Sequence, residues 1–388
     1  MFCDQFATSR LAQPSLWALR EQHFFGMGCD MLIPDILLLK PNRVWRTYSG
    51  GKYLDILEHK SFPSDSHFPE DWIASTIKAT NIGREDIVDE GYSKVEIQGR
   101  SFTLKDLFQQ FPQELLGDDH FVKFGPNTQV LTKLLDSAVR LHIQAHPTIS
   151  FSKKHLNSNS GKTEAYVILS VREEISAPYV FIGFQHPASK KEFREAVHKQ
   201  DIPRLLSCFD KIPVAPGDVF IVPGGLPHAI GEGILMIEIM EPTDFVVRLE
   251  FDRGGYVLPE QSRFMGRDID FALEMINFNA ISSDEIKQQL FCYPEIITVQ
   301  EKSVEYKVID MQKTPCFSVN KLDVHKLYKK KADSFYIGVV SKGNGRIDSE
   351  SQHVEVRAGD KFFIPKKTGE LQYNTEEGLQ LFLVFPPQ

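Results

Sequence analysis

The chain contains 388 residues, of which 42% are hydrophobic and 25% are charged, and this composition is typical of a folded globular protein with two or more domains. Its net charge of −8 argues against nucleic acid as the main partner, because no domain-wide excess of basic residues is available to neutralise phosphates. The five cysteines show no CxxC spacing, which favours reduced thiols in a cytoplasmic protein over a disulfide framework.

No membrane contact is expected from the first part of the chain. The apolar stretch MLIPDILLLK (31–40) is too short to span a bilayer, and Pro34 and Asp35 interrupt it. Residues 1–30 also lack the layout of a signal peptide.

The elements expected in chain order begin with a partly helical lead-in at residues 1–45, where PSLWALREQHFF has helical spacing. The segment 93–108 alternates like a hairpin whose turn lies at Gln98-Gly99. From residue 139 the pattern is mainly β, and it returns to β after each helical insertion. Helices are predicted at residues 111–117 and 128–138, in a pair within 187–212 that divides at Pro203, and at residues 268–276.

An internal repeat indicates the architecture. VAPGDVFIVPGGLPH (214–228) aligns with VRAGDKFFIPKKTGE (356–370), so that Gly217-Asp218 matches Gly359-Asp360. A turn, strand and turn that recur at this length predict two copies of one antiparallel jelly-roll barrel. We therefore expect a mainly β fold with helical insertions, in which residues 46–270 form a metal-binding barrel domain with a small helical subdomain at 111–138 and 187–212. Residues 271–388 are expected to form a second barrel domain.

Four residues of the first domain form a candidate metal site. Gln144 and His146 lie on a predicted strand, where alternate residues face the same side, and Glu164 and His228 follow on later β segments. One amide, two imidazoles and one carboxylate suit a borderline ion such as zinc, although a lone histidine on a strand is more often a hydrogen-bonded structural residue. Where the first copy of the repeat has His228, the second has Glu370, so the second barrel is expected to carry no metal.

Several motifs together resemble a known family. GGKYLD, PEDWIASTIKA, IQAHP, GKTEAY, APGDVFIVPGGLPHAI and EIMEPTDFVVRLEFDR cover about residues 46 to 276, and GNGRI…AGDKFFIP follows near the C-terminus. The chain resembles type I mannose-6-phosphate isomerases, which are zinc enzymes of the cupin superfamily, and in particular their shorter bacterial form. This resemblance implies two cupin-type barrels, of which the second is metal-free.

The resemblance also implies roles for individual residues. One Zn²⁺ per chain would be held by Gln144, His146, Glu164 and His228. The catalytic residues implied by matching motifs are Arg248, Lys162 and Glu238; the substrate-binding candidates are Arg253, His142 and Lys78. His142 stands where the family often has serine, and Gly254 stands where the longer form has a lysine, with Arg253 one place earlier. Lys162, Glu238 and water at the metal all remain candidates for the base that moves the proton.

The predicted function is a zinc-dependent exchange of an aldose and a ketose, mannose 6-phosphate and fructose 6-phosphate, through an enediol-type intermediate. The expected partner is this small sugar phosphate, with neither nucleic acid nor membrane, and a monomer is compatible with the sequence. Two alternatives compete with this hypothesis: another metal-dependent cupin enzyme such as a dioxygenase, and a non-catalytic sugar-phosphate-binding or regulatory cupin. The presence of Lys162, Arg248 and all four metal ligands favours the isomerase.

Overall fold

The computed structural model describes residues 31–388, and residues 35–388 form one unit of structure. The predicted helix in PSLWALREQHFF lies outside the described residues. Antiparallel strands predominate in the described unit, and most of them belong to two barrels, so the predicted fold class is confirmed. Among residues 31–388, no helix is both long and apolar enough to cross a membrane.

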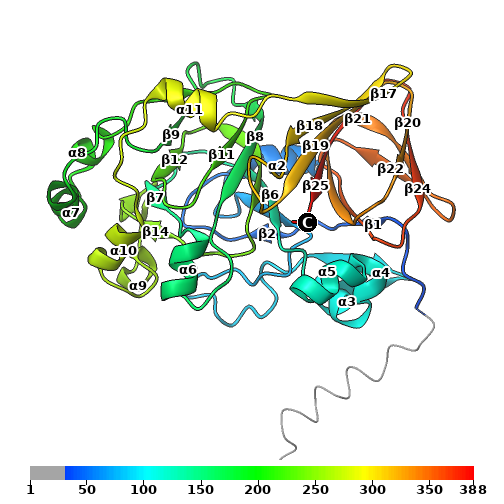
Figure 1. The fold of residues 1–388 in the computed structure, drawn as a ribbon, viewed down its shortest axis with the longest axis horizontal. Coiled ribbons are helices and arrows are strands. Elements are labelled where there is room, and N and C mark those ends of the chain that lie inside the picture. The colour runs from blue at the N-terminus through cyan, green and yellow to red at the C-terminus, as the bar shows by residue number, and fades with distance from the viewer. Residues whose placement is uncertain (1–30) are drawn as a thin grey trace, which may run out of the picture. The chain divides into compact units, whose positions relative to one another are not determined.

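The first barrel consists of two facing sheets (Figure 1). The larger sheet contains, in spatial order, β11 (Val219–Val222), β8 (Glu164–Val171), β13 (Ile234–Met240), β6 (Leu131–Asp136), β3 (Glu70–Ile73) and β2 (Arg43–Val44). The smaller sheet contains β10 (Ile212–Pro213), β9 (Tyr179–Ile182), β12 (His228–Ile230), β7 (Gln144–Ala145) and β14 (Val247–Arg248). Two separate hairpins are formed by β4 (Lys94–Ile97) with β5 (Arg100–Thr103) and by β15 (Asp252–Arg253) with β16 (Tyr256–Val257).

The second barrel repeats the strand order of the first. Its main sheet contains β1 (Leu37–Leu38), β23 (Lys361–Ile364), β21 (Tyr336–Asp348), β25 (Leu379–Phe385), β19 (Ser318–Val324), β18 (Ser303–Ile309) and β17 (Glu295–Gln300). The remaining strands are β20 (Leu327–Lys331), β22 (His353–Arg357) and β24 (Glu370–Asn374). The order β23-β21-β25-β19 matches β11-β8-β13-β6, and β24 pairs with β20 as β12 pairs with β7.

The aligned turns of the repeat have the same geometry in both barrels. Gly217 and Gly359 have φ angles of +100° and +93°, a conformation that glycine adopts without strain. In each turn the following aspartate accepts a hydrogen bond from the backbone N–H three residues earlier, at 2.8 Å for Asp218 and 2.9 Å for Asp360. The predicted hairpin at Gln98-Gly99 is also present, between β4 and β5.

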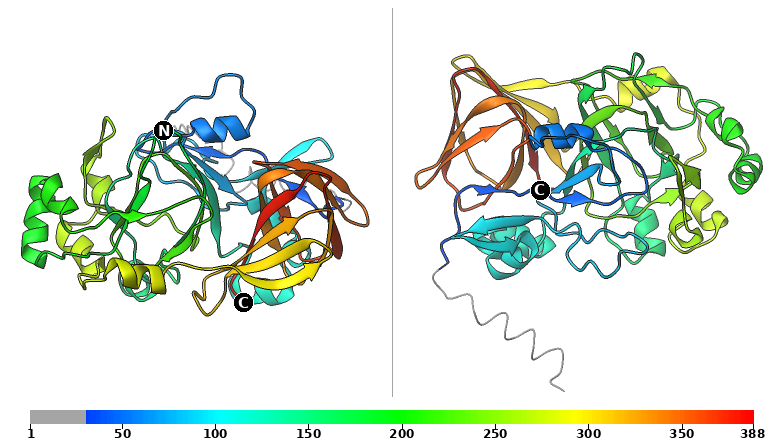
Figure 2. Two further views of the ribbon diagram at one scale, coloured as in Figure 1. Left: turned by 90° about the horizontal axis from the view of Figure 1, so that it is seen from above. Right: turned by 180° about the vertical axis from the view of Figure 1, so that it is seen from behind.

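Ten helices lie between the strands of the described chain. They are α2 (Lys52–Leu57), α3 (Leu104–Gln110), α4 (Pro112–Leu116), α5 (Asp118–Phe124), α6 (Ile149–His155), α7 (Lys190–Lys199), α8 (Ile202–Leu206), α9 (Glu260–Arg263), α10 (Ile269–Met275) and α11 (Ser283–Gln289). The helix predicted at 268–276 corresponds to α10. Figure 2 shows α2 (blue) between the two barrels, where Leu57 approaches Gly359 of the second barrel.

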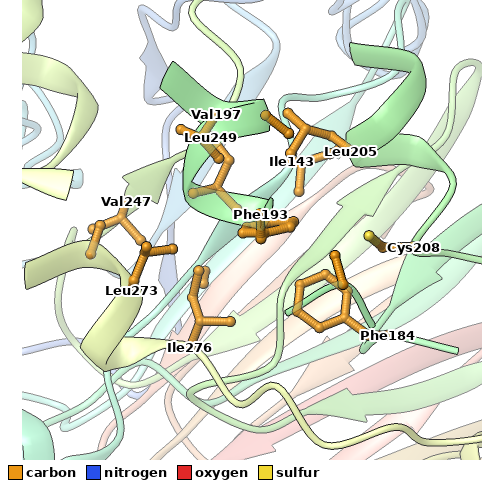
Figure 3. Close-up of a cluster of buried hydrophobic side chains, with 14 of the residues drawn as sticks. Ile143, Phe184, Phe193, Val197, Leu205, Cys208, Val247, Leu249, Leu273 and Ile276 are labelled. Atoms are coloured by element: carbon orange, nitrogen blue, oxygen red, sulfur yellow. The ribbon is translucent and has the colours of Figure 1, made fainter. Parts of the chain in front are cut away.

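One cluster of apolar side chains fixes the smaller sheet from outside (Figure 3). Ile143, Ala145 and Val247 project from this sheet into a buried cluster with Phe193 of α7 and Leu273 of α10. Because side chains alternate along a strand, Gln144, which lies between Ile143 and Ala145, faces the interior of the barrel. Helix packing thus holds the strands that carry part of the functional site.

The helix predicted at 128–138 is wrong, because this segment contains β6. All six residues of β6 are buried, since it lies between β13 and β3 and both of its faces are covered. A strand buried on both faces shows no alternation of polar and apolar residues. Leucine and lysine also favour helices intrinsically, and pairing with the neighbouring strands overrides that preference.

Two further expectations differ in detail from the structure. The pair of helices within 187–212 divides at Gln200-Asp201 and not at Pro203, because Pro203 occupies the first turn of α8, where its missing N–H costs no hydrogen bond.

The boundary expected at 270–271 falls inside α10. Since Leu290 and Phe291 pack with Phe220 of the first barrel, we propose a boundary just after Cys292.

Candidate active site

The interior of the first barrel is lined by one row of residues from each sheet. Across the larger sheet, the register places Trp72, Lys133, Glu238 and Tyr166 side by side. Residues paired in this way point to the same face, as does Glu164, which lies two positions before Tyr166 on β8. The functional groups on this face therefore come from four neighbouring strands.

The facing row belongs to the smaller sheet. Here His228 is paired with Gln144, which in turn is paired with Arg248. His146 lies two residues beyond Gln144, just past the end of β7. The metal-ligand candidates thus come from both sheets and meet between them.

Three of the four predicted ligands form a compact buried cluster. His146 Nε2 lies 3.1 Å from Glu164 Oε1, and His228 Nε2 lies 3.3 Å from Glu164 Oε2. Their ligand atoms all lie within 4.8 Å of one another, and within the described chain this is the one such group of histidine, cysteine and carboxylate residues. The side-chain amide of Gln144 is 3.3 Å from His228 Nε2, so the fourth residue lies at the same place.

Backbone carbonyls orient both imidazole rings. His146 Nδ1 donates to the carbonyl of Phe245 at 2.7 Å, and His228 Nδ1 donates to the carbonyl of Leu226 at 2.9 Å. With the proton on Nδ1, each Nε2 presents its lone pair to Glu164. Metal-binding histidines are commonly oriented by such a hydrogen bond on the other ring nitrogen.

The charges of this cluster favour a cation. Glu164 is fully buried, and Tyr166 donates its hydroxyl to Oε2. Two nitrogen lone pairs that face a buried carboxylate repel it unless a positive charge lies between them. Lys162 Nζ is 3.1 Å from Glu164 Oε1 and 3.4 Å from His146 Nε2. The donor set fits a divalent metal ion.

Burial and neighbouring groups set the protonation of the cluster. Burial alone would raise the pKa of Glu164, but the neighbouring Lys162 ammonium group holds this pKa well below its usual value. Burial lowers the pKa of His146 to about 3. At neutral pH the carboxylate is therefore ionised and the imidazole neutral, which are the forms that bind metals.

A second group of buried charges lies on the same large sheet, farther along the wall of the barrel interior from Glu164. Glu70 accepts hydrogen bonds from Tyr48 at 2.6 Å, Trp72 at 2.7 Å and Arg46 at 2.9 Å. Lys133 Nζ lies 3.3 Å from Glu70 and 2.9 Å from Glu238. Buried charges persist only when they are paired in this way. The result is a fixed row of alternating charge that ends at Glu238.

The carboxyl group of Glu238 differs from that of Glu70. Burial raises the pKa of Glu238; Lys133 opposes this shift, and Glu164 and Glu70 add to it. Glu70 has the same burial, but Arg46 and Lys133 hold its pKa well below the ordinary value. Glu238 is therefore the wall carboxylate better suited to exchange a proton.

Arg248 and His142 complete the wall of a small cavity. This cavity of about 40 Å³ is lined by Lys133, Glu238, Lys162 and Gln144 together with these two residues. Its volume suffices for a few water molecules. Arg248 Nη1 donates to the carbonyl of Ser262 at 3.0 Å, and His142 Nδ1 lies 3.0 Å from the carbonyl of Glu250.

The structure does not bring Arg253 and Lys78 to this cavity. Arg253 lies on β15 and donates from Nε to the carbonyl of Arg140. Lys78 is exposed, and its Nζ donates to the carbonyl of Glu85 at 3.2 Å. Neither side chain is among the described residues that line the cavity.

Sequence reasoning missed Lys133, its partner Glu70, and Arg46, which also pairs with Glu70. Lys133 is only 2% exposed, but the helix predicted at 128–138 concealed its position on a central strand. The signal was present as a lysine inside the apolar run VLTKLL (130–135), because a charged residue in a fully buried strand requires a partner.

Comparison with known proteins supports a family assignment. The family model "Mannose-6-phosphate isomerase, cupin domain" matches residues 308–380. The Bacillus subtilis (strain 168) protein named "Probable mannose-6-phosphate isomerase GmuF" is 30% identical over 275 residues, which cover 69% of this chain and 79% of that protein. The chain belongs to the mannose-6-phosphate isomerase family. A "Mannose-6-phosphate isomerase" of Streptococcus mutans is 28% identical over 283 residues, which cover 71% of this chain and 82% of that relative.

Solved structures share the fold of this family member. A mannose 6-phosphate isomerase from Bacillus subtilis superposes with a TM-score of 0.69 at 21% identity, over 90% of this chain and 99% of that one. A mannose 6-phosphate isomerase solved with zinc and yttrium bound gives a TM-score of 0.66 at 15% identity, over 92% of this chain and 100% of the other. These likenesses confirm the two-barrel cupin fold that the resemblance implied.

The buried His142 should make the folded state less stable in acid. Burial lowers its pKa to about 4, whereas an unfolded histidine titrates near about 6.5. Between these pH values the unfolded chain binds a proton that the folded chain does not. The contribution of His142 to the free energy of unfolding is therefore fully present above about pH 6.5 and is lost as the pH falls toward 4. We expect His142→Gln to remove about 2 kcal/mol of the difference between the unfolding free energies at pH 7 and pH 4.5.

Urea denaturation of the parent and the variant at both pH values measures this difference. The denaturant m value should stay unchanged, which shows that both proteins unfold in the same way. An equal pH dependence in the parent and in His142→Gln would contradict the assignment.

Proposed function

We propose that this chain interconverts mannose 6-phosphate and fructose 6-phosphate, with one Zn²⁺ held by Gln144, His146, Glu164 and His228. The observation that carries the proposal is the buried Glu164 carboxylate, whose two oxygens each face an imidazole Nε2 atom. The names of the two relatives above support the reaction, and the solved family structure with bound zinc supports the metal.

The reaction moves a proton between two adjacent carbon atoms of the sugar. When bound, zinc supplies Lewis-acid polarisation of the carbonyl and hydroxyl oxygens on those carbons. The protein must then provide a base for a carbon-bound proton and positive charge for the developing enediol-type intermediate. The wall of the cavity contains both kinds of group.

We assign the base to Glu238. Its raised pKa makes the carboxylate a stronger base than an ordinary glutamate, and the fixed Lys133 at 2.9 Å positions it. Lys162 is the alternative, but its ammonium group lies among the metal-ligand candidates, 3.1 Å from Glu164, where it balances their negative charge. We therefore infer that Lys162 supports the charge of the site and that Glu238 moves the proton.

Arg248 is the candidate for binding the anionic part of the substrate. A guanidinium is always charged and offers a planar fork of donors that matches a phosphate or an enediolate. Arg248 faces Gln144 across the smaller sheet, so it lies beside the proposed metal.

Removal and return of the metal tests the proposed function. We expect the purified chain to convert mannose 6-phosphate in a coupled assay, to lose this activity after chelation and to regain it with Zn²⁺, because Lewis-acid polarisation is needed at both reacting oxygens. Return of Mg²⁺ is the matched control and should restore little, since a site with two imidazoles disfavours this ion. A folded, zinc-loaded chain without turnover would contradict the proposal.

Substitution of the two candidate bases separates their roles. We expect Glu238→Gln to reduce kcat by about 10²–10⁴-fold and to abolish the exchange of the C2 proton with deuterium from D₂O, because no base remains to remove it. Lys162→Met should reduce turnover but retain measurable exchange. NMR of the recovered mannose 6-phosphate measures the exchange. Exchange that persists in Glu238→Gln and is absent from Lys162→Met would instead assign the base to Lys162.

A further inference from the structure

A buried ion pair connects the second barrel to the strand that carries part of the active-site wall. Lys361, the first residue of β23, places its Nζ against the carboxylate of Asp71 on β3. The two side chains are 5% and 2% exposed and lie 290 positions apart in the sequence. Neither residue belongs to the site described above.

Lys361 departs from the internal repeat. The turns Gly217-Asp218 and Gly359-Asp360 superpose in sequence and in hydrogen bonding, and the next residue is Val219 in the first barrel and Lys361 in the second. Val219 is 3% exposed, so the fold accepts an apolar residue here. A lysine at such a position carries a desolvation cost that its partner must offset.

Asp71 lies directly between two residues that face the interior of the first barrel. Glu70 and Trp72 flank it on β3, and because side chains alternate, they point into the barrel, where Glu70 lines the cavity, while Asp71 projects toward the second barrel. Asn42 adds a second restraint, since its backbone N–H donates to Asp71 at 2.8 Å and its side chain donates to the carbonyl of Trp72 at 3.0 Å. The position of β3 is therefore fixed from the side opposite to the cavity.

The placement of the charged side chains in the cavity wall depends on the position of β3. Glu70 is one of the two carboxylates that hold Lys133, and Lys133 in turn holds Glu238 at 2.9 Å. A replacement of a buried ion pair by apolar residues is often neutral or stabilising, so stability alone does not account for this pair. A displacement of about 1 Å in catalytic geometry can reduce turnover by about 10²-fold.

We propose that Lys361 is a positioning residue: through Asp71, the second barrel fixes β3 so that Glu70 and Lys133 hold Glu238 in its working position. This inference rests on the proposed function for its effect on turnover. It also gives the second barrel a role in the reaction, although that barrel contributes no residue to the cavity described here.

The test is the double variant Lys361→Met with Asp71→Asn. It removes both charges together, keeps the side-chain volumes similar and leaves an oxygen to accept from Asn42. We expect the melting temperature to stay within a few degrees of the parent, kcat to fall about 10- to 100-fold and KM to change less than about twofold, since Gln144 and Arg248 are not on β3. The ¹⁹F NMR signal of 5-fluorotryptophan at Trp72, assigned with Trp72→Phe, should shift.

A matched control removes a similar pair elsewhere in the second barrel. Lys330 and Glu305 lie 2.7 Å apart with side chains 15% and 5% exposed, and Glu305 also accepts hydrogen bonds from Asn320 and Tyr328 of the same barrel. Lys330→Met with Glu305→Gln should leave kcat and the Trp72 signal as in the parent. If the first double variant does not fold, Asp71→Glu keeps the ion pair but lengthens it, and it should still shift the Trp72 signal and reduce kcat.

The outcomes separate the two proposals. Parental kcat and an unchanged Trp72 signal in the folded Lys361→Met, Asp71→Asn variant, or in Asp71→Glu, would overturn the positioning role. A parent chain without isomerase turnover would overturn the proposed function, while the Trp72 signal would still report whether Lys361 fixes β3.

Discussion

The structure of the site depends on one buried carboxylate. Glu164 has no exposure to solvent, and both of its oxygens face groups that come from other strands. A buried negative charge is stable only when positive charge or hydrogen-bond donors surround it. Tyr166 supplies one donor and Lys162 one charge, while the two imidazoles offer lone pairs. These donors fit a divalent cation, and the chemistry proposed above begins there.

The two-sheet barrel makes this arrangement possible. Glu164 lies on the larger sheet, whereas Gln144 and His228 are paired in the smaller one, so closing the barrel brings the candidate ligands together. Apolar side chains between the smaller sheet and helices α7 and α10 hold that sheet from outside. On the other side, the second barrel contacts β3 through Lys361 and Asp71. Each sheet of the site is thus supported by a different part of the chain.

Local rules account for the repeated turns and for the gathering of the candidate ligands, both of which the sequence predicted. The repeated turns were visible because Gly217 and Gly359 have positive φ angles, which restrict those positions largely to glycine. The candidate ligands were visible because alternation along β7 separates Gln144 from the apolar Ile143 and Ala145, which pack outward. Both signals operate within a few residues, and both are independent of the rest of the fold.

Non-local pairing accounts for what the sequence did not predict. Lys133 was assigned to a helix because β6 is covered on both faces and shows no alternation. Its partners Glu70 and Glu238 are distant in the sequence, and Lys361 is 290 positions from Asp71, so no local pattern connects them. Arg253 and Lys78 were predicted to contact the substrate, and neither lines the cavity, because each side chain donates to a backbone carbonyl. A charge inside an apolar run predicts that a partner exists, and only the fold identifies that partner.

X-ray absorption at the zinc edge of the zinc-loaded chain tests the central claim most directly. The account predicts a first shell of nitrogen and oxygen only, at about 2.0–2.2 Å, with the outer-shell scattering of two imidazoles from His146 and His228. Replacement of Glu164 by glutamine should weaken zinc retention in the same samples. A sulfur shell near about 2.3 Å, which would place the metal on one of the cysteines, or the absence of imidazole scattering would contradict the account.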